Sequence, residues 1–201
     1  MFKEVYKKFP SWRLILIGQA KKEDEKFLRK LKKMTRGHAI RIIEKLSVEK
    51  LRDFYSHASI YWHATGFGED EIKNPQMMEH FGIATVEAQA AGAVPIVIDK
   101  GGQKEIVEDG KNGLLWSTKS QVYEATLNLI NNPDKIRDWA RLIGKEDDRE
   151  RLNAICRKAG FPDAVSTSSF YETLEKNLFD PYSTPKTRGI PVNEESLLDA
   201  L

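Results

Sequence analysis

The chain has 201 residues, of which 32 are Lys or Arg and 30 are Asp or Glu, so its net charge is only +2. This length and a mean hydropathy of −0.51 indicate a soluble globular protein with one domain, or one domain plus an appendage. The near-neutral charge argues against a nucleic-acid partner, and a single cysteine, Cys156, excludes an internal disulfide and fits a reducing compartment.

The N-terminal segment MFKEVYKKFPSW carries basic residues but lacks the apolar core and cleavage site of a signal peptide. The first apolar run, Leu14 to Ile17, has only the length of a strand. No stretch approaches the ~18 consecutive apolar residues that a membrane span needs. We therefore expect a cytoplasmic protein with no transmembrane segment, and peripheral membrane contact stays open.

Short apolar runs alternate with amphipathic helical patterns, which is typical of an α/β fold with a parallel sheet. In chain order we expect a strand at 13–17, a helix at 24–34, a strand at 40–43, a helix from an N-cap at Ser47 to about 57, a strand at 59–62, a helix at 82–91, a strand at 93–99, a short helix at 105–107, a strand at 114–116, and helices at 120–131 and 134–143.

The character of the chain changes after about Gly144. A charge cluster, KEDDRER, comes first, and residues 150–158 and 170–178 carry helical patterns. From Pro181 onward there is little apolar content, which favours an extended or poorly ordered tail. We therefore predict a domain over residues 1–144 and a helical extension with a flexible tail over 145–201.

The segment EHFGIATVE, residues 79–87, carries the candidate chemistry. Its helix begins at about Gly82 on the loop after a parallel strand, where open α/β sheets bind ligands and where a helix N-terminus suits a diphosphate. Glu79 before the helix and Glu87 inside it would then grip different hydroxyls of a sugar nucleotide. On spacing alone, two exposed glutamates flanking an ordinary helix are the simpler interpretation.

The flanking residues favour the functional interpretation. YWHATGFGEDE at 61–71 and EHFGIATVEAQAAGAVPIVIDKGGQKEIVEDGKNGLLW at 79–116 closely resemble the C-terminal, donor-binding domain of retaining glycosyltransferases of the GT-B fold, the group 1 or glycogen-synthase-like superfamily. The resemblance covers about residues 10–143 and joins three motifs in the right order. It implies a Rossmann-like parallel sheet with flanking helices, which is one half of a GT-B fold.

The resemblance also implies roles for individual residues. Glu79 would be the catalytic position that contacts the transferred sugar, and Glu87 would bind the ribose hydroxyls. Donor sugar and diphosphate would be held around His80, Phe81, Gly82 and Ile83, with a weaker assignment of Glu44 and Leu46 to the nucleobase.

Four other positions are less specific. Ala84 stands where several relatives have a hydroxyl residue, which removes one phosphate contact. His63, like His80, either lines the donor cleft or satisfies a local hydrogen bond. Lys104 is best interpreted as a surface lysine, and the acidic run GEDE at 68–71 as a solvated loop without the His or Cys of a metal site.

The family implies transfer of a hexose from a UDP- or GDP-sugar with retention of configuration. The leaving diphosphate helps to deprotonate the acceptor, so neither a protein nucleophile nor a metal or other cofactor is expected.

A GT-B enzyme also has an N-terminal domain, which would hold a glycan or lipid-linked acceptor. That domain, the first strand of the donor-binding domain, and an Arg and a Lys that clamp the diphosphate have no counterpart here. We therefore expect a glycosyltransferase domain that is inactive alone. The alternative is a non-catalytic nucleotide-sugar-binding or interaction module derived from such an enzyme.

Overall fold

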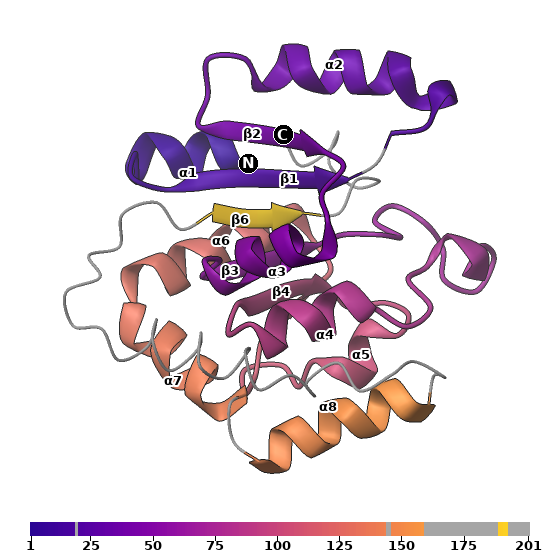
Figure 1. Cartoon of the computed structure of the whole chain (residues 1–201), viewed down its shortest axis with the longest axis vertical. Helices are drawn as coiled ribbons and strands as arrows, with labels where there is room; N and C mark the ends of the chain where they lie inside the picture. The colour runs from indigo at the N-terminus through magenta and orange to yellow at the C-terminus, as the bar shows by residue number, and fades with distance from the viewer. Residues whose placement is uncertain (19, 144–145, 159–188, 193–201) are drawn as a thin grey trace.

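A computed structural model of the chain describes residues 1–18, 20–143, 146–158 and 189–192. At its centre lies a six-stranded sheet whose neighbouring strands all run parallel, with helices on both faces (Figure 1). The predicted α/β fold with a Rossmann-like sheet is confirmed. The strands are β1 (Arg13–Gly18), β2 (Ile40–Glu44), β3 (Ile60–His63), β4 (Val94–Ile98), β5 (Leu114–Trp116) and β6 (Gly189–Val192). The helices are α1 (Phe2–Lys8), α2 (Glu25–Thr35), α3 (Val48–Ser56), α4 (Ile83–Ala90), α5 (Gln103–Ile106), α6 (Lys119–Asn131), α7 (Pro133–Ile143) and α8 (Glu146–Lys158), with short 3-10 turns η1 (Lys22–Asp24) and η2 (Pro75–Met77).

The elements follow the sequence-based expectation closely. All five expected strands form, and none differs from its prediction by more than one residue at either end. Ser47 caps α3 as expected, because its Oγ accepts the backbone N–H of Lys50 at 3.4 Å. Helix α1 is not among the predicted helices, although Phe2 and Val5, three residues apart, are both fully buried.

The order of the strands indicates where a sheet of this kind would bind a ligand. That order is β2-β1-β6-β3-β4-β5. From β1 the chain passes through α2 to β2, which forms one edge of the sheet. From β3 it passes in the opposite direction, through β4 to β5 at the other edge of the sheet. The winding direction therefore reverses between β1 and β3, and open parallel sheets bind ligands at the carboxyl ends of strands beside such a reversal.

Strand β6 fills the position at this reversal. It pairs along β1 from Arg13↔Gly189 to Leu16↔Val192, and Val192 also pairs with Trp62 of β3. The helix expected at 150–158 is confirmed within α8, while the one expected at 170–178 lies outside the described residues. The division of the chain at residue 144 stays a prediction.

Hydrophobic side chains pack on both faces of the sheet in two separate clusters. Along β3, Ile60 and Trp62 join the cluster that includes α1 and α6, whereas Tyr61 joins the cluster that includes α3 and α4. Burial on both faces explains why the central strands β3 and β4 show no regular polar alternation, whereas β2 at the edge of the sheet is partly exposed. Trp62 Nε1 donates to Thr126 Oγ1 at 3.0 Å, which satisfies the polar atom of a buried ring.

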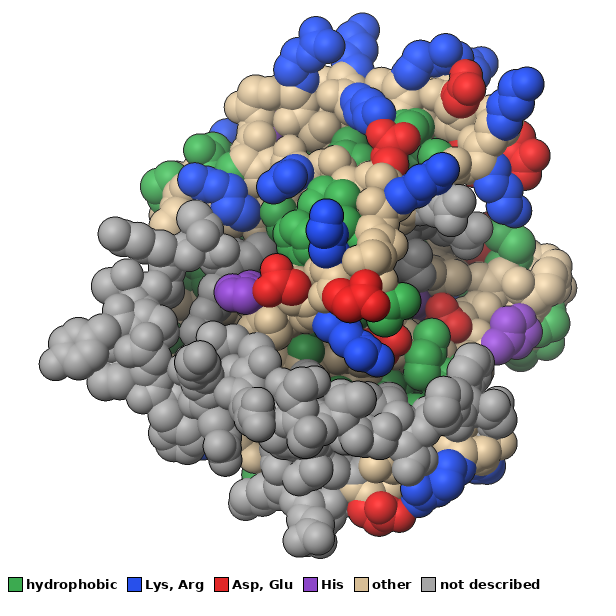
Figure 2. Space-filling model, in the orientation of Figure 1, with side chains coloured by type: hydrophobic (Ala, Val, Ile, Leu, Met, Phe, Trp, Pro, Cys, Tyr) green, Lys and Arg blue, Asp and Glu red, His purple; other side chains and the backbone are tan. Residues whose placement is uncertain are grey.

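Helix α2 presents a basic surface at one end of the molecule. Lys and Arg side chains gather over this end in Figure 2, and Leu31 on the inner side of the helix is buried. The exposed basic residues of α2 are Lys26, Arg29, Lys30, Lys32 and Lys33. In the part of the chain that the structure describes, no helix is long and apolar enough to cross a membrane.

Candidate functional site

The candidate site lies where the chain leaves β3 and enters α4, at the carboxyl edge of the sheet. β3 ends at His63, a long loop follows, and α4 begins at Ile83. Gly82, which precedes α4, has a φ of +90°. A Cβ there would lie 2.8 Å from Gln103 Nε2 and 2.9 Å from Ile106 Cδ1, so the position requires glycine for its backbone angle and for its packing.

The carboxylate of Glu79 lies beside the N-terminus of α4 and accepts from the two residues that precede the helix. Its Oε1 accepts the backbone N–H of Gly82 at 3.1 Å and that of Phe81 at 3.4 Å. These amides belong to the group that the family resemblance assigns to the donor. An anion at this position is favoured because the first N–H groups of a helix have no partner within the helix and carry partial positive charge.

His63 lies directly beneath this carboxylate. Its side chain is fully buried, and its Nε2 lies 3.5 Å from Glu79 Oε2. Contact with His63 lowers the pKa of Glu79 below its ordinary value of 4.5. The N–H groups of Gly82 and Phe81 act in the same direction, and burial opposes them. The charged form of Glu79 is thus the one that its surroundings hold.

Glu87 lies further along α4 in a different environment. It is half-buried, and burial raises its pKa above 4.5, while the charge of Arg52 on α3 acts in the opposite direction. Burial also raises the pKa of Tyr55, and the charge of Glu87 adds to that rise. The two glutamates of the motif therefore differ: Glu79 is held as an anion by donors, and Glu87 is partly withdrawn from water.

A buried polar pair supports the start of α4 from below. Thr85 Oγ1 donates to Gln103 Oε1 at 2.8 Å, and both side chains are fully buried. Gln103 Nε2, which faces Gly82, has no hydrogen-bond partner among the described residues. Neither Thr85 nor Gln103 is among the predicted site residues. The sequence offered a signal only for Thr85, a polar residue within the helix expected at 82–91, because Gln103 precedes the short helix expected at 105–107.

The turn Gly101-Gly102 packs directly against the backbone of the motif. A Cβ on Gly101 would lie 2.3 Å from the carbonyl oxygen of Glu79, and one on Gly102 would lie 2.5 Å from that of His80. Gly102 also donates its N–H to the Glu79 carbonyl oxygen at 2.9 Å. The two glycines of GGQKEIV thus fix the path of the chain on which Glu79 is carried.

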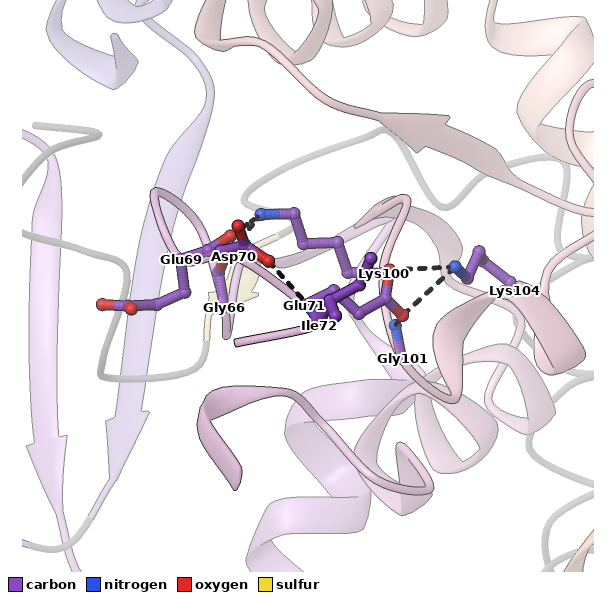
Figure 3. Close-up of polar contacts among 8 residues, drawn as sticks. All are labelled: Gly66, Glu69, Asp70, Glu71, Ile72, Lys100, Gly101 and Lys104. Carbon is purple, nitrogen blue, oxygen red and sulfur yellow. Dashed lines mark hydrogen bonds and ion pairs between the residues drawn. The ribbon is translucent and has the colours of Figure 1, made fainter. Parts of the chain in front are cut away.

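The loop between β3 and α4 is fastened to the turn after β4 by a lysine. Lys100 Nζ donates to the backbone carbonyl oxygens of Gly66, at 3.1 Å, and of Glu69 (Figure 3). A charged donor shared by two carbonyls holds the near end of the loop in place.

A second contact fastens the acidic part of the same loop. Glu71 Oε1 accepts the N–H of Gly101 at 2.9 Å, and its two oxygens accept from Lys104 Nζ at 3.2 and 3.1 Å (Figure 3). Asp70 Oδ1 accepts two backbone N–H groups of its own turn. Lys104 is exposed, as expected for a surface lysine, and the acidic residues 68–71 are exposed or half-buried, as expected for a solvated loop. The contacts add that both hold the loop to the turn after β4.

The other predicted site residues lie in varied surroundings. His80 is exposed, whereas Phe81 and Ile83 are partly buried against the cluster that includes α3 and α4. Glu44 ends β2 and pairs with a lysine of α2, and Leu46 is half-buried in the following turn. Their assignment to the donor or its base stays a prediction. Among the described residues, no group of three or more His, Cys, Asp or Glu is placed to hold a metal ion.

Two curated proteins share sequence with this chain. It is 30% identical over 111 residues to the alpha-maltose-1-phosphate synthase of Mycolicibacterium smegmatis, over 51% of this chain and 26% of that protein. It is 29% identical over 117 residues to the D-inositol 3-phosphate glycosyltransferase of Nocardia farcinica, over 55% of this chain and 23% of that protein. The chain thus spans about a quarter of the length of these relatives.

Solved structures agree with the fold. The C-terminal domain of a glycosyl transferase group 1 family protein from Francisella tularensis superposes with a TM-score of 0.57 at 21% identity, over 78% of this chain and 73% of that one. Sucrose-phosphate synthase from Thermosynechococcus elongatus superposes with a TM-score of 0.54 at 20% identity, over 82% of this chain and 39% of that one. The sequence profile of the glycosyl transferases group 1 matches residues 1–145, most of the described chain. This chain belongs to the glycosyl transferases group 1 family.

Proposed function

We propose that this chain binds a nucleoside diphosphate sugar at the N-terminus of α4 and contributes this donor site to a retaining hexosyl transfer. The observation that carries the proposal is the position of the Glu79 carboxylate beside the N-terminus of α4. A carboxylate held by the N–H groups of Phe81 and Gly82 marks an anion site at the edge of the sheet where ligands bind.

In this proposal the diphosphate and the donor sugar take up the amides that Glu79 now occupies. Glu79 then turns towards the hydroxyls of the sugar, where its charged form accepts hydrogen bonds. Glu87 binds the ribose hydroxyls from the half-buried face that α4 shares with α3. Charge on the leaving diphosphate is met by backbone dipoles at the helix start, and the proposal includes no metal or other cofactor.

The acceptor is not part of the site on this chain. The two curated relatives are named for different phosphorylated compounds and do not point to one acceptor. We propose that the acceptor is a glycan or a lipid-linked molecule bound by a separate N-terminal domain. We propose that the chain alone binds the donor without transferring its sugar.

Calorimetric titration with UDP- and GDP-hexoses tests the proposal. One of the two nucleotide classes should bind, and Glu87→Ala should weaken that binding by about tenfold or more, because a charge-assisted hydrogen bond is worth about 1.5–3 kcal/mol. Glu108→Ala is the matched control, since the Glu108 carboxylate pairs with its neighbour Lys111 on the surface. No binding of either class, or equal binding by Glu87→Ala, would contradict the proposed function.

A further inference from the structure

We infer that His63 is a positioning residue for Glu79: its buried imidazole keeps the carboxylate in the site when the donor takes over the amides of α4. This inference rests on the proposed function and adds a residue to it. The juxtaposition that carries it is the 3.5 Å approach of His63 Nε2 to Glu79 Oε2.

The imidazole of His63 needs an acceptor. The ring is fully buried, and neither of its nitrogens has a hydrogen-bond partner within the described residues. A neutral imidazole always carries one N–H, and a buried N–H without an acceptor costs free energy. The Glu79 carboxylate faces this ring, so we place the proton on Nε2.

The present distance is longer than a normal N–H···O bond, and there is a reason for that. Glu79 Oε1 is drawn to the N–H groups of Phe81 and Gly82, which pull the carboxylate towards the helix. When a donor sugar takes those amides, the carboxylate loses its partners at Oε1 and is free to close on the imidazole. Contacts of this kind are often long in unliganded enzymes and shorten in the complex.

The two partners differ in how firmly they are held. His63 ends β3, pairs with Val97 of β4, and its carbonyl oxygen accepts the indole N–H of Trp116 at 3.2 Å. Glu79 lies on the loop before α4, and its side chain is 28% exposed. The histidine is therefore the fixed anchor and the carboxylate is the group that moves.

Two substitutions separate positioning from packing. His63→Phe keeps a ring of similar size and removes the donor, whereas His63→Gln retains an N–H near the place of Nε2. Binding of the nucleotide sugar and of the matching nucleoside diphosphate is measured for each variant by calorimetry. His63→Phe should weaken binding of the nucleotide sugar by about tenfold, which corresponds to one lost hydrogen bond to a charged group. Binding of the nucleoside diphosphate should stay nearly unchanged. His63→Gln should restore most of the loss.

A double-mutant cycle identifies the partner. In a Glu79→Ala background, which lacks the acceptor oxygens, His63→Phe should change nucleotide-sugar binding by less than about twofold, because the interaction is already absent. The inference would be overturned if a folded His63→Phe variant lost equal affinity for the nucleotide sugar and the nucleoside diphosphate, or lost no affinity for either.

A ligand-free measurement distinguishes this inference from the proposed function. Nitrogen-15 NMR of the wild-type protein should show the His63 proton on Nε2, with a ring signal that shifts in Glu79→Gln. An unchanged signal overturns the His63–Glu79 contact. If the wild type binds neither nucleotide class, the proposed function fails, and the role of His63 towards a sugar fails with it even where the NMR contact is present.

Discussion

Glu79 and Glu87 stand eight positions apart on one segment, and their surroundings act on them in opposite directions. Donors around Glu79 favour its charged form, and burial of Glu87 disfavours it. Because a pKa that differs between folded and unfolded chain makes stability depend on pH, the two residues should respond oppositely to the same substitution.

Glu79→Gln should lower the free energy of unfolding at pH 7 by about 1–3 kcal/mol, since it removes the charge that accepts two amides and faces His63. The pKa of Glu79 is lowered on folding, so its stabilisation is complete above the unfolded value near 4.5 and is lost as the pH falls through the folded value. Urea unfolding at pH 7 and pH 3 measures this. A difference from wild type that does not shrink at pH 3 would contradict it.

Glu87→Gln should have the opposite effect and raise the free energy of unfolding at pH 7. The pKa of Glu87 is raised on folding, so the stability linked to its protonated form is present below about 4.5 and is lost as the pH rises through the folded value. Glutamine carries no charge and avoids that loss. The free energy of unfolding of the variant should therefore be about 0.5–1 kcal/mol higher at pH 7, a gain that is common for substitutions at functional sites. Thermal unfolding between pH 4 and pH 8 tests it, and a variant less stable than wild type at pH 7 would refute the assignment.

Gly82→Ala should destabilise the protein by about 2–3 kcal/mol, because an alanine at a left-handed φ is strained and its Cβ also meets Gln103 and Ile106. Gly110→Ala is the matched control. Gly110 has a φ of +75°, but a Cβ added there would meet open space. Backbone strain alone should therefore lower the free energy of unfolding of this variant by about 1 kcal/mol. Chemical denaturation of both variants gives the comparison, and equal costs would mean that packing beneath α4 contributes nothing.

At the scale of elements, the loop from β3 to α4 has its shape because the turn after β4 holds it at Lys100 and Lys104. Its polar contacts are partly exposed, and exposed ion pairs add little to global stability. We expect their effect to be local, because they hold the loop that leads to Glu79.

Glu71→Gln should therefore change the free energy of unfolding by less than about 1 kcal/mol while increasing hydrogen exchange across residues 64–78 several-fold. Hydrogen-exchange mass spectrometry of the native protein measures this. Glu108→Gln, which breaks a surface pair elsewhere, should leave the exchange of 64–78 unchanged. Exchange in Glu71→Gln equal to that of wild type would show that Lys100 holds the loop without help.

The five expected strands were predictable because each is a short, mainly apolar run, and β3 and β4 are buried along their whole length. Strand β6 was not, because Gly189 and Pro191 are poor strand residues and the partner strands lie far away in the chain. The resemblance was sufficient to find Glu79 and Glu87. The contact of His63 with Glu79 was not predictable, since it depends on the path of a long loop that the lysines and glycines of another turn determine.

At the scale of the whole molecule, β6 joins the β1–β2 pair to the β3–β4–β5 group. A chain ending at Lys158 should therefore unfold at lower urea concentration and over a broader range than one ending at Val192, because its sheet lacks the middle strand. Tryptophan fluorescence and circular dichroism follow the transition, and the chain ending at Val192 is the control that retains β6. Coincident unfolding curves for the two chains would contradict this role of β6.

The place of β6 also bears on the order in which the chain is made. β1 is synthesised well before β6, yet Leu14 of one lies beside Ile190 of the other. During synthesis the edges of β1 and β3 that β6 covers stay open until β6 itself has emerged. Pairings over such separations form slowly, and open edges invite contact with other chains. Assembly of the complete sheet is thus a late event, and in a cell it falls within the period in which chaperones act.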